Sequence, residues 1–382
     1  MSKYDVSVYY FPNYHKGDAF NEQWHGKGWM EWELLKKATP RFEGHDQPKI
    51  PLWGYEDESE ISVMEKKIET AYKYGINNLI FDWYWYEKGP FLNKPLDNAF
   101  LRASNREKIK FSLMWANHDW AEIHPVSKAY HNSQKIQLSG KISKDEFFNA
   151  IDYIIANYFT QPNYYRLDGG LYFSIYEVNK LLAIFGTMEG VKSCIKEIRK
   201  RVKEAGLGEL NLNAIVFGLS SLAYETGCKL DGKELKELGF DSATSYVWIH
   251  EHSIDFPVQE YSSFREICEK DFERLSNKYK GIPYYPNVTC GWDSSPRTVQ
   301  SDVYENIGYP YTGILKNNNK EEFEIALRNV KAKLDKSDLQ TKMFTVNAWN
   351  EWTEGSYLEP DTVEGFGKLE AIKKVFKETD IK

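Results

Sequence analysis

The sequence predicts an α/β protein with a (β/α)8 TIM-barrel fold, as a single domain over residues 1–382. Strand-like and helix-like segments alternate along the whole chain, which is typical of parallel sheets with crossover helices. Most strand-like segments are continuous runs of apolar, β-branched or aromatic residues, the pattern of strands that are buried on both faces. Eight such segments occur, the number that closes this barrel.

The expected strands, in chain order, are residues 6–11, 77–85, 109–116, 170–177, 211–218, 240–248, 282–288 and 342–349. The segment 219–239 is a weak helix candidate, so seven or nine strands remain alternatives.

Four segments between the strands carry apolar residues at helical spacing: residues 61–71, 147–158, 195–205 and 323–334. Gly75 and Gly206 follow two of them, as a residue that ends a helix would.

The segment 12–58 is the longest stretch without a clear period, and we expect an extended, aromatic-rich loop after the first strand. Loops of this length in compact domains are usually functional or disordered. This one carries four tryptophans, and disordered segments are poor in aromatic residues. A functional loop is therefore the prediction.

Composition excludes several classes of function. A net charge of −7 disfavours nucleic acid or an anionic membrane as the main partner. The four cysteines are scattered, and neither metal-ligand spacing nor a phosphate- or dinucleotide-binding motif occurs, so we expect no metal and no cofactor. No leader pattern and no 18-residue apolar span is visible, which predicts a cytoplasmic protein without a membrane span.

Aromatic residues make up 15% of the chain, and the 12 tryptophans fall at predicted strand ends or in the loop 12–58. In a barrel of this class the active site lies at the carboxyl ends of the strands. We therefore predict that the tryptophans gather at one mouth, where indole rings stack on the apolar faces of sugars and polar side chains bind the hydroxyls.

The predicted substrate-binding residues are His15, Trp29, Glu31, Trp32, Asp82, Tyr84, Trp85, Trp115, Asn117, Trp120, Trp248, Trp292, Asp293, Arg297, Asn350, Trp352 and Tyr357. Tryptophans that only fill the core or plug the barrel end are the competing interpretation.

Glu351 and Glu354 follow the last predicted strand. Glycoside hydrolysis generally uses two carboxyl groups, one of which protonates the leaving oxygen. In a helical turn or tight loop, residues three apart bring their Cβ atoms within about 5–6 Å. Adjacent carboxylates among aromatic residues should retain a proton to higher pH, so we predict that this pair is catalytic. Glu359 is a third candidate.

The chain resembles the WbsX-like proteins of polysaccharide gene clusters, which look related to glycoside hydrolase family 99. The motifs that carry the resemblance include YYFPNYH (9–15), WHGKGWMEW (24–32), FEGHDQPKIPLWGY (42–55), GINNLIFDWYWY (75–86), WANHDW (115–120), GWDSSPR (291–297) and NAWNEWTEGSYLEPD (347–361).

The resemblance implies a (β/α)8 fold and action on α-linked glycans. By the family's E-W-x-E-G motif, Glu354 would be the general acid/base. Glu351 would deprotonate the sugar 2-hydroxyl, which then attacks its own anomeric carbon to give an epoxide-like intermediate with net retention. Asn13-Tyr14 and His118-Asp119 depart from the usual pattern within the expected sugar cleft, which puts the identity of the sugar in doubt rather than the chemistry.

Three functions are therefore compared, each with an oligosaccharide or polysaccharide as the partner. The first is a retaining glycoside hydrolase, and the second is a glycosyltransferase that builds such a glycan. The third, a binding protein without catalysis, is disfavoured because binding alone does not require Glu351 and Glu354 at this spacing.

Overall fold

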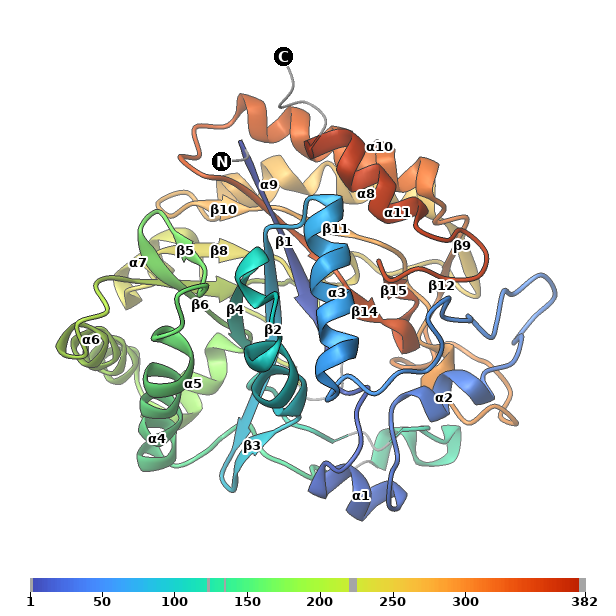
Figure 1. Ribbon diagram of the computed structural model, residues 1–382, viewed down its shortest axis with the longest axis horizontal. Helices are drawn as coiled ribbons and strands as arrows, with labels where there is room; N and C mark the ends of the chain where they lie inside the picture. The colour runs from blue at the N-terminus through green and yellow to red at the C-terminus, as the bar shows by residue number, and fades with distance from the viewer. Residues whose placement is uncertain (1–2, 122–123, 134, 220–224, 378–382) are drawn as a thin grey trace.

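The computed structural model describes residues 3–121, 124–133, 135–219 and 225–377. A nearly closed barrel of parallel strands forms its centre, and helices surround it (Figure 1). The predicted TIM-barrel class is confirmed. The barrel strands are β1 (Tyr4–Tyr10), β2 (Asn78–Tyr86), β4 (Lys110–Trp115), β6 (Gly170–Ile175), β7 (Leu210–Ile215), β8 (Ser242–Thr244), β10 (Tyr284–Tyr285), β11 (Asn287–Thr289) and β13 (Lys342–Asn347).

Each predicted strand overlaps a barrel strand, but the seventh is divided into two. Pro286 separates β10 from β11, and proline has no amide hydrogen to donate to a strand ladder. β10 pairs with β8, with Tyr284 opposite Ala243. β11 pairs with β13, with Asn287 opposite Thr345. The divided strand therefore joins the two ends of the sheet, and nine strand segments occupy eight barrel positions.

Helices cover the outside of the barrel, and the four helices predicted from periodicity are present. The helices are α3 (Ile61–Tyr74), α4 (Lys144–Ile154), α5 (Val178–Phe185), α6 (Met188–Glu204), α7 (Gly232–Leu238), α8 (Tyr261–Cys268), α9 (Asp271–Lys278), α10 (Lys320–Lys336) and α11 (Gly367–Ile372). α3 ends at Gly75 as predicted, with Gly75 in the left-handed region at φ 90°.

The segment 12–58 is more regular than expected. It contains α1 (Ala19–His25) and α2 (Trp32–Lys37), and the Asp18 side chain caps α1 by accepting from the amides of Phe20 and Asn21. These helices have seven and six residues, too few for a clear helical period. β1 points toward α1 and α2 in Figure 1, so this segment lies at the carboxyl end of the barrel.

Six short strands lie outside the barrel wall: β3 (Gly89–Phe91), β5 (Arg166–Leu167), β9 (Val258–Glu260), β12 (Ile314–Lys316), β14 (Asn350–Glu351) and β15 (Ser356–Tyr357). The remaining turns are η1 (Pro95–Ala99), η2 (Phe100–Arg102), η3 (Arg106–Lys108), η4 (Lys128–Ser133), η5 (Ile155–Phe159), η6 (Trp248–His250), η7 (Ser295–Arg297), η8 (Trp352–Glu354) and η9 (Lys373–Lys377).

The interior of the barrel contains a hydrogen-bonded polar layer. Asn78 on β2 donates to Ser7 on β1 at 3.2 Å and to Ser112 on β4 at 3.0 Å. Asn213 on β7 donates to Ser174 on β6 and to Thr244 on β8. These side chains are fully buried, so their partners offset the cost of removing them from water.

Candidate active site

The loop after β13 presents both predicted catalytic carboxyl groups. β14 and β15 form a hairpin in which Glu351 lies opposite Ser356, and Glu354 ends the intervening turn η8. Gly355 follows with φ 64°, and a Cβ atom there would lie 2.8 Å from the Cβ of Asp293. Glycine is therefore required after Glu354, both for the left-handed backbone and for the close approach of the loop after β11.

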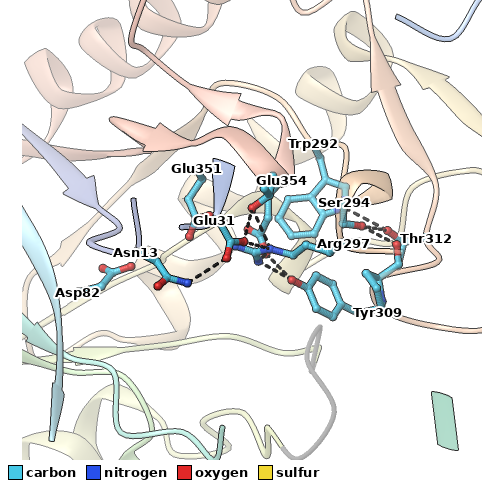
Figure 2. Close-up of polar contacts among 12 residues, drawn as sticks. Asn13, Glu31, Asp82, Trp292, Ser294, Arg297, Tyr309, Thr312, Glu351 and Glu354 are labelled. Atoms are coloured by element: carbon cyan, nitrogen blue, oxygen red, sulfur yellow. Dashed lines mark hydrogen bonds and ion pairs between the residues drawn. The ribbon is translucent and has the colours of Figure 1, made fainter. Parts of the chain in front are cut away.

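Arg297 joins the two glutamates to a third. Its Nη2 lies 3.1 Å from Oε2 of Glu351, its Nη1 donates to Glu354, and its Nε lies 3.1 Å from Oε1 of Glu31. Figure 2 shows the three carboxyl groups converging on this guanidinium. We call Arg297, Glu31, Glu351 and Glu354 the Arg297 cluster. All four side chains are at least nine-tenths buried.

Hydroxyl and amide donors orient this cluster. The Tyr309 hydroxyl donates to Glu354 at 2.8 Å. Thr353 donates to Oε1 of Glu31 at 2.8 Å, and Asn13 donates to its Oε2 at 2.9 Å (Figure 2). Both oxygens of Glu31 are thus bonded within the protein. Glu31 therefore positions Arg297.

A fourth carboxyl group, that of Asp82, lies apart from the guanidinium (Figure 2). The Tyr246 hydroxyl lies 3.0 Å from Oδ2 of Asp82 and 3.5 Å from Oε1 of Glu351, so it connects Asp82 to the Arg297 cluster. Oδ1 of Asp82 is buried and has no hydrogen-bond partner among the described residues.

Burial raises the pKa of Glu351 well above the ordinary 4.5, and the neighbouring Glu354 raises it further, while Arg297 opposes both effects. Burial also raises the pKa of Glu354, against the influence of Arg297 and of the Tyr309 hydroxyl. Burial also raises the pKa of Asp82 well above its ordinary value. Glu351, Glu354 and Asp82 therefore retain protons to higher pH than exposed acids do.

A cavity opens above these carboxyl groups, and we call it the Arg297 cavity. Eight predicted site residues line it: Glu31, Asp82, Tyr84, Trp120, Trp292, Arg297, Glu351 and Glu354. Asn13, His118 and Asp119, at which the sequence departs from the family pattern, line it as well. The structure therefore brings the predicted catalytic pair and its polar neighbours into one hollow.

The prediction that all tryptophans gather at the mouth is wrong. On β2, Asp82 and Tyr84 face the Arg297 cavity, so the alternation of a strand turns Trp83 and Trp85 outward. The Trp85 indole donates to Glu146 of α4 at 2.7 Å.

Trp115 on β4 likewise points outward and stacks on Phe147 of α4 at 5.1 Å. Trp248 donates to the carbonyl of Asn287 and packs against α8, away from the Arg297 cavity. Trp29 stacks on His25 at 4.0 Å. The interpretation that these tryptophans fill the core or the periphery fits their positions.

Other predicted site residues support loops instead of lining the Arg297 cavity. Asn117 exchanges hydrogen bonds with the backbone of Glu177, which joins two strand ends. The Asp293 carboxylate accepts from His45 and Gln47 of the loop 12–58. The remaining members of this group are His15, Trp32, Asn350, Trp352 and Tyr357, which are all buried.

A second ionic group lies beside the loop that follows β13, and we call Lys67, Glu58 and Glu359 the Lys67 cluster. The Lys67 ammonium contacts Glu58 and lies 2.6 Å from Glu359. The indoles of Trp349 and Trp352 each donate to Glu359 at 2.7 Å. Glu359, proposed as a third candidate catalytic group, is thus enclosed and holds the strand end that carries Glu351.

Several cavity residues were not predicted: Phe11, Met114, Ala116, His124, Tyr176, Tyr246, Val247, His250 and Tyr309. Met114 and Ala116 could have been found by strand alternation, because Trp115 between them faces α4. Tyr309 lies in a long loop that no local pattern connects to the site.

No group of three or more histidine, cysteine or acidic residues with metal-binding geometry occurs in the described part of the chain. All four cysteines are buried and free. No helix within residues 3–121, 124–133, 135–219 and 225–377 is long and apolar enough to span a membrane.

The barrel, with acidic side chains at the carboxyl ends of its strands, has a glycosidase-like fold. It resembles the GH99 endo-alpha-mannosidase from Bacteroides thetaiotaomicron with a TM-score of 0.57 at 14% identity, over 98% of this chain and 97% of that one. A structure described as a glycoside hydrolase-like protein gives a TM-score of 0.61 at 15% identity, over 98% and 94% of the two chains.

The family described as "Glycosyltransferase WbsX" matches residues 6–372, and the protein belongs to this family. The relative named "Uncharacterized protein WxcX" from Xanthomonas campestris pv. campestris is 26% identical over 380 residues. That alignment covers 96% of this chain and 49% of the relative, so the chain spans about half the length of the curated relatives it matches.

Proposed function

We propose that this protein is a retaining glycoside hydrolase that acts on α-linked glycans, with Glu354 as the general acid/base and Glu351 as the group that activates the sugar 2-hydroxyl. The observation that carries the proposal is the Arg297 cluster. Two carboxyl groups with raised pKa values share one guanidinium in a cavity at the carboxyl end of the barrel.

In the proposed first step, Glu354 transfers its proton to the glycosidic oxygen while the bond from that oxygen to the anomeric carbon breaks. Glu351 takes the proton of the 2-hydroxyl, and the 2-oxygen closes on the anomeric carbon to form an epoxide. In the second step, the Glu354 carboxylate takes a proton from water, whose oxygen attacks the anomeric carbon while the bond from the 2-oxygen to that carbon breaks. Glu351 returns its proton to the 2-oxygen, so the net change is hydrolysis with retention.

The two carboxyl groups of the Arg297 cluster can exchange protons. Burial raises the pKa of both Glu351 and Glu354, while Arg297 favours the ionised form of each. Interacting carboxyl groups titrate as a unit. A glycosidic oxygen beside Glu354 and a 2-hydroxyl beside Glu351 would then fix which group carries the shared proton.

The relation to the endo-alpha-mannosidase structure suggests α-mannosidic linkages as the first substrates to test. The likeness at 14% identity concerns the fold, so this choice of sugar belongs to the proposal.

Transfer of a sugar to a second glycan is the alternative function, and the description of the family favours it. Both reactions can be assayed together by incubating the protein with α-linked manno-oligosaccharides, with and without nucleotide sugars. Release of shorter sugars that requires only water supports hydrolysis. Extension that requires a nucleotide sugar would replace the hydrolase proposal with the transferase, and binding with neither product would leave a carbohydrate-binding protein.

A further inference from the structure

A second cavity lies next to the Arg297 cavity, and we call it the Lys368 cavity. It has a volume of about 380 Å³, against about 70 Å³ for the Arg297 cavity. Residues from the loop 42–49, from the segment 314–319 that begins in β12, and from the segment 355–368 after Glu354 line it. Trp292 lines both cavities.

Lys368 is a buried side chain of this cavity whose donors are unused among the described residues. It is 8% exposed, and it forms no hydrogen bond or ion pair with any residue that the structure describes. Its ammonium group lies over the Tyr357 ring, 5.0 Å from the centroid. Burial lowers the pKa of Lys368, while Cys290, Glu364 and Asp361 partly oppose this effect. A buried ammonium group without an acceptor is costly, which makes Lys368 unusual in this structure.

The buried carboxylates nearby are already bonded to other groups. Asp361 accepts from the Tyr357 hydroxyl at 2.8 Å and from the backbone amides of Val363 and Glu364. Asp293 accepts from two side chains of the loop 12–58 and from the amide of Ser295. None of these groups accepts from Lys368 in this structure, so an oxygen of a bound ligand can take that place.

The remaining wall has the composition of a sugar-binding surface. Asn317 and Asn318 each donate one hydrogen bond within the protein, to Glu260 and to the carbonyl of Cys290, and their side-chain oxygens form none with described residues. Phe42 and Trp292 supply aromatic surface. Amide groups, an unpaired ammonium and aromatic rings together suit a pyranose, whose oxygens need donors and whose C–H faces pack on rings.

We propose that the Lys368 cavity is a second saccharide-binding subsite, in which a sugar oxygen, either of a hydroxyl or of a carboxylate, accepts a hydrogen bond from Nζ of Lys368. This inference rests on the proposed function and extends it, because it assigns a place to a glycan unit that the smaller Arg297 cavity does not hold. The backbone of the wall also touches the catalytic loop: the amide of Asp293 donates to the carbonyl of Glu354 at 2.6 Å.

The test compares affinities for a series of α-linked manno-oligosaccharides, from the disaccharide to the hexasaccharide, by titration calorimetry. Glu354→Gln serves as the background, so that bound sugars are not cleaved. We expect Lys368→Met to weaken binding of the longer oligosaccharides about tenfold, the effect of removing a hydrogen bond from a charged donor. Binding of the disaccharide should be unchanged.

Lys316→Met is the matched control, because Lys316 lines the same cavity but is half-exposed and already paired with Glu260. It should leave every affinity unchanged. A parallel series with a terminal glucuronate identifies the acceptor: a larger loss for the acidic sugars assigns a carboxylate, and an equal loss assigns a hydroxyl. Thermal unfolding of both lysine variants confirms that they are folded.

The outcomes separate the two proposals. If no oligosaccharide binds the Glu354→Gln protein, the proposed function fails. If oligosaccharides bind and Lys368→Met has no more effect than Lys316→Met at any length, the second subsite is overturned while the proposed function stands.

Discussion

The Arg297 cluster and the Lys67 cluster place one buried cation among glutamates at the same end of the barrel, but they differ in what surrounds them. Around Lys67, Glu359 accepts from two indoles and Glu58 accepts from Asn350 at 2.8 Å. No part of this cluster lines the Arg297 cavity. It is closed by protein groups, and it supports the loop above it.

The Arg297 cluster is open where the Lys67 cluster is closed. Its members line a cavity, and Asp82 adds a further carboxyl group to that lining. Burial raises the pKa values of Glu351, Glu354 and Asp82 while the cavity keeps them accessible, as proton transfer to a ligand requires. Both clusters bury their charges, so access to a cavity is what distinguishes the Arg297 cluster from the Lys67 cluster.

The largest expected effect separates the two clusters by activity. Replacing Glu354 with glutamine removes the proposed acid, so turnover of the oligosaccharide that proves to be cleaved should fall at least about a hundredfold, while sugar affinity is kept. The matched change Glu359→Gln keeps the proposed acid and should retain turnover per folded molecule. Rates normalised to folded protein measure both. Equal turnover in Glu354→Gln and the unmodified protein contradicts the assignment.

The next effect separates the clusters by stability. Lys67→Met leaves Glu58 and Glu359 buried without their cation, which should lower the free energy of unfolding by about 3–5 kcal/mol. Its neighbour Lys66 pairs with Glu56 at the surface, so Lys66→Met should cost less than about 1 kcal/mol. Urea unfolding at pH 7 compares the two variants. Similar midpoints would show that the Lys67 cluster does not hold the fold.

A third effect concerns pH. Burial raises the pKa of Glu58 from 4.5 to about 7, although Lys67 opposes the shift. As pH rises between these values, the unfolded chain releases this proton before the folded protein does, so the contribution of Glu58 to stability falls. Glu58→Gln should therefore gain stability relative to the unmodified protein, by on the order of 3 kcal/mol across this window. Parallel unfolding curves from pH 4.5 to 8 test it, and a constant difference would refute it.

The smallest expected effect is a shift in the pH–rate profile, which tests whether Asp82 titrates together with the Arg297 cluster. The Tyr246 hydroxyl donates to Asp82 and so lowers the pKa of that carboxyl group against the effect of burial. Tyr246→Phe should move the alkaline limb of the pH–rate profile upward by about one unit, because a carboxyl without this donor keeps its proton longer. Tyr84→Phe is the control, since the Tyr84 hydroxyl forms no hydrogen bond with described residues while it lines the same cavity. Equal profiles would exclude Asp82 from the titrating unit.

The barrel and the position of the loop that carries Glu351 and Glu354 could be predicted from the order of residues alone. Continuous apolar runs mark strands buried on both faces, and the spacing of Glu351 and Glu354 directly after the last strand places both at the mouth. These features are local, so the order of residues is sufficient to show them.

The set of side chains that share the Arg297 cavity depends on long-range contacts in the folded chain. The sequence does not show which partner Trp85 and Trp115 contact. The folded structure shows that both contact α4, outside the barrel. Arg297 is more than fifty residues from Glu351 and Glu354, at 54 and 57 positions, and Glu31 lies further still. These contacts between distant residues form because the closed barrel brings the loops after different strands together. The neighbouring sequence does not determine them.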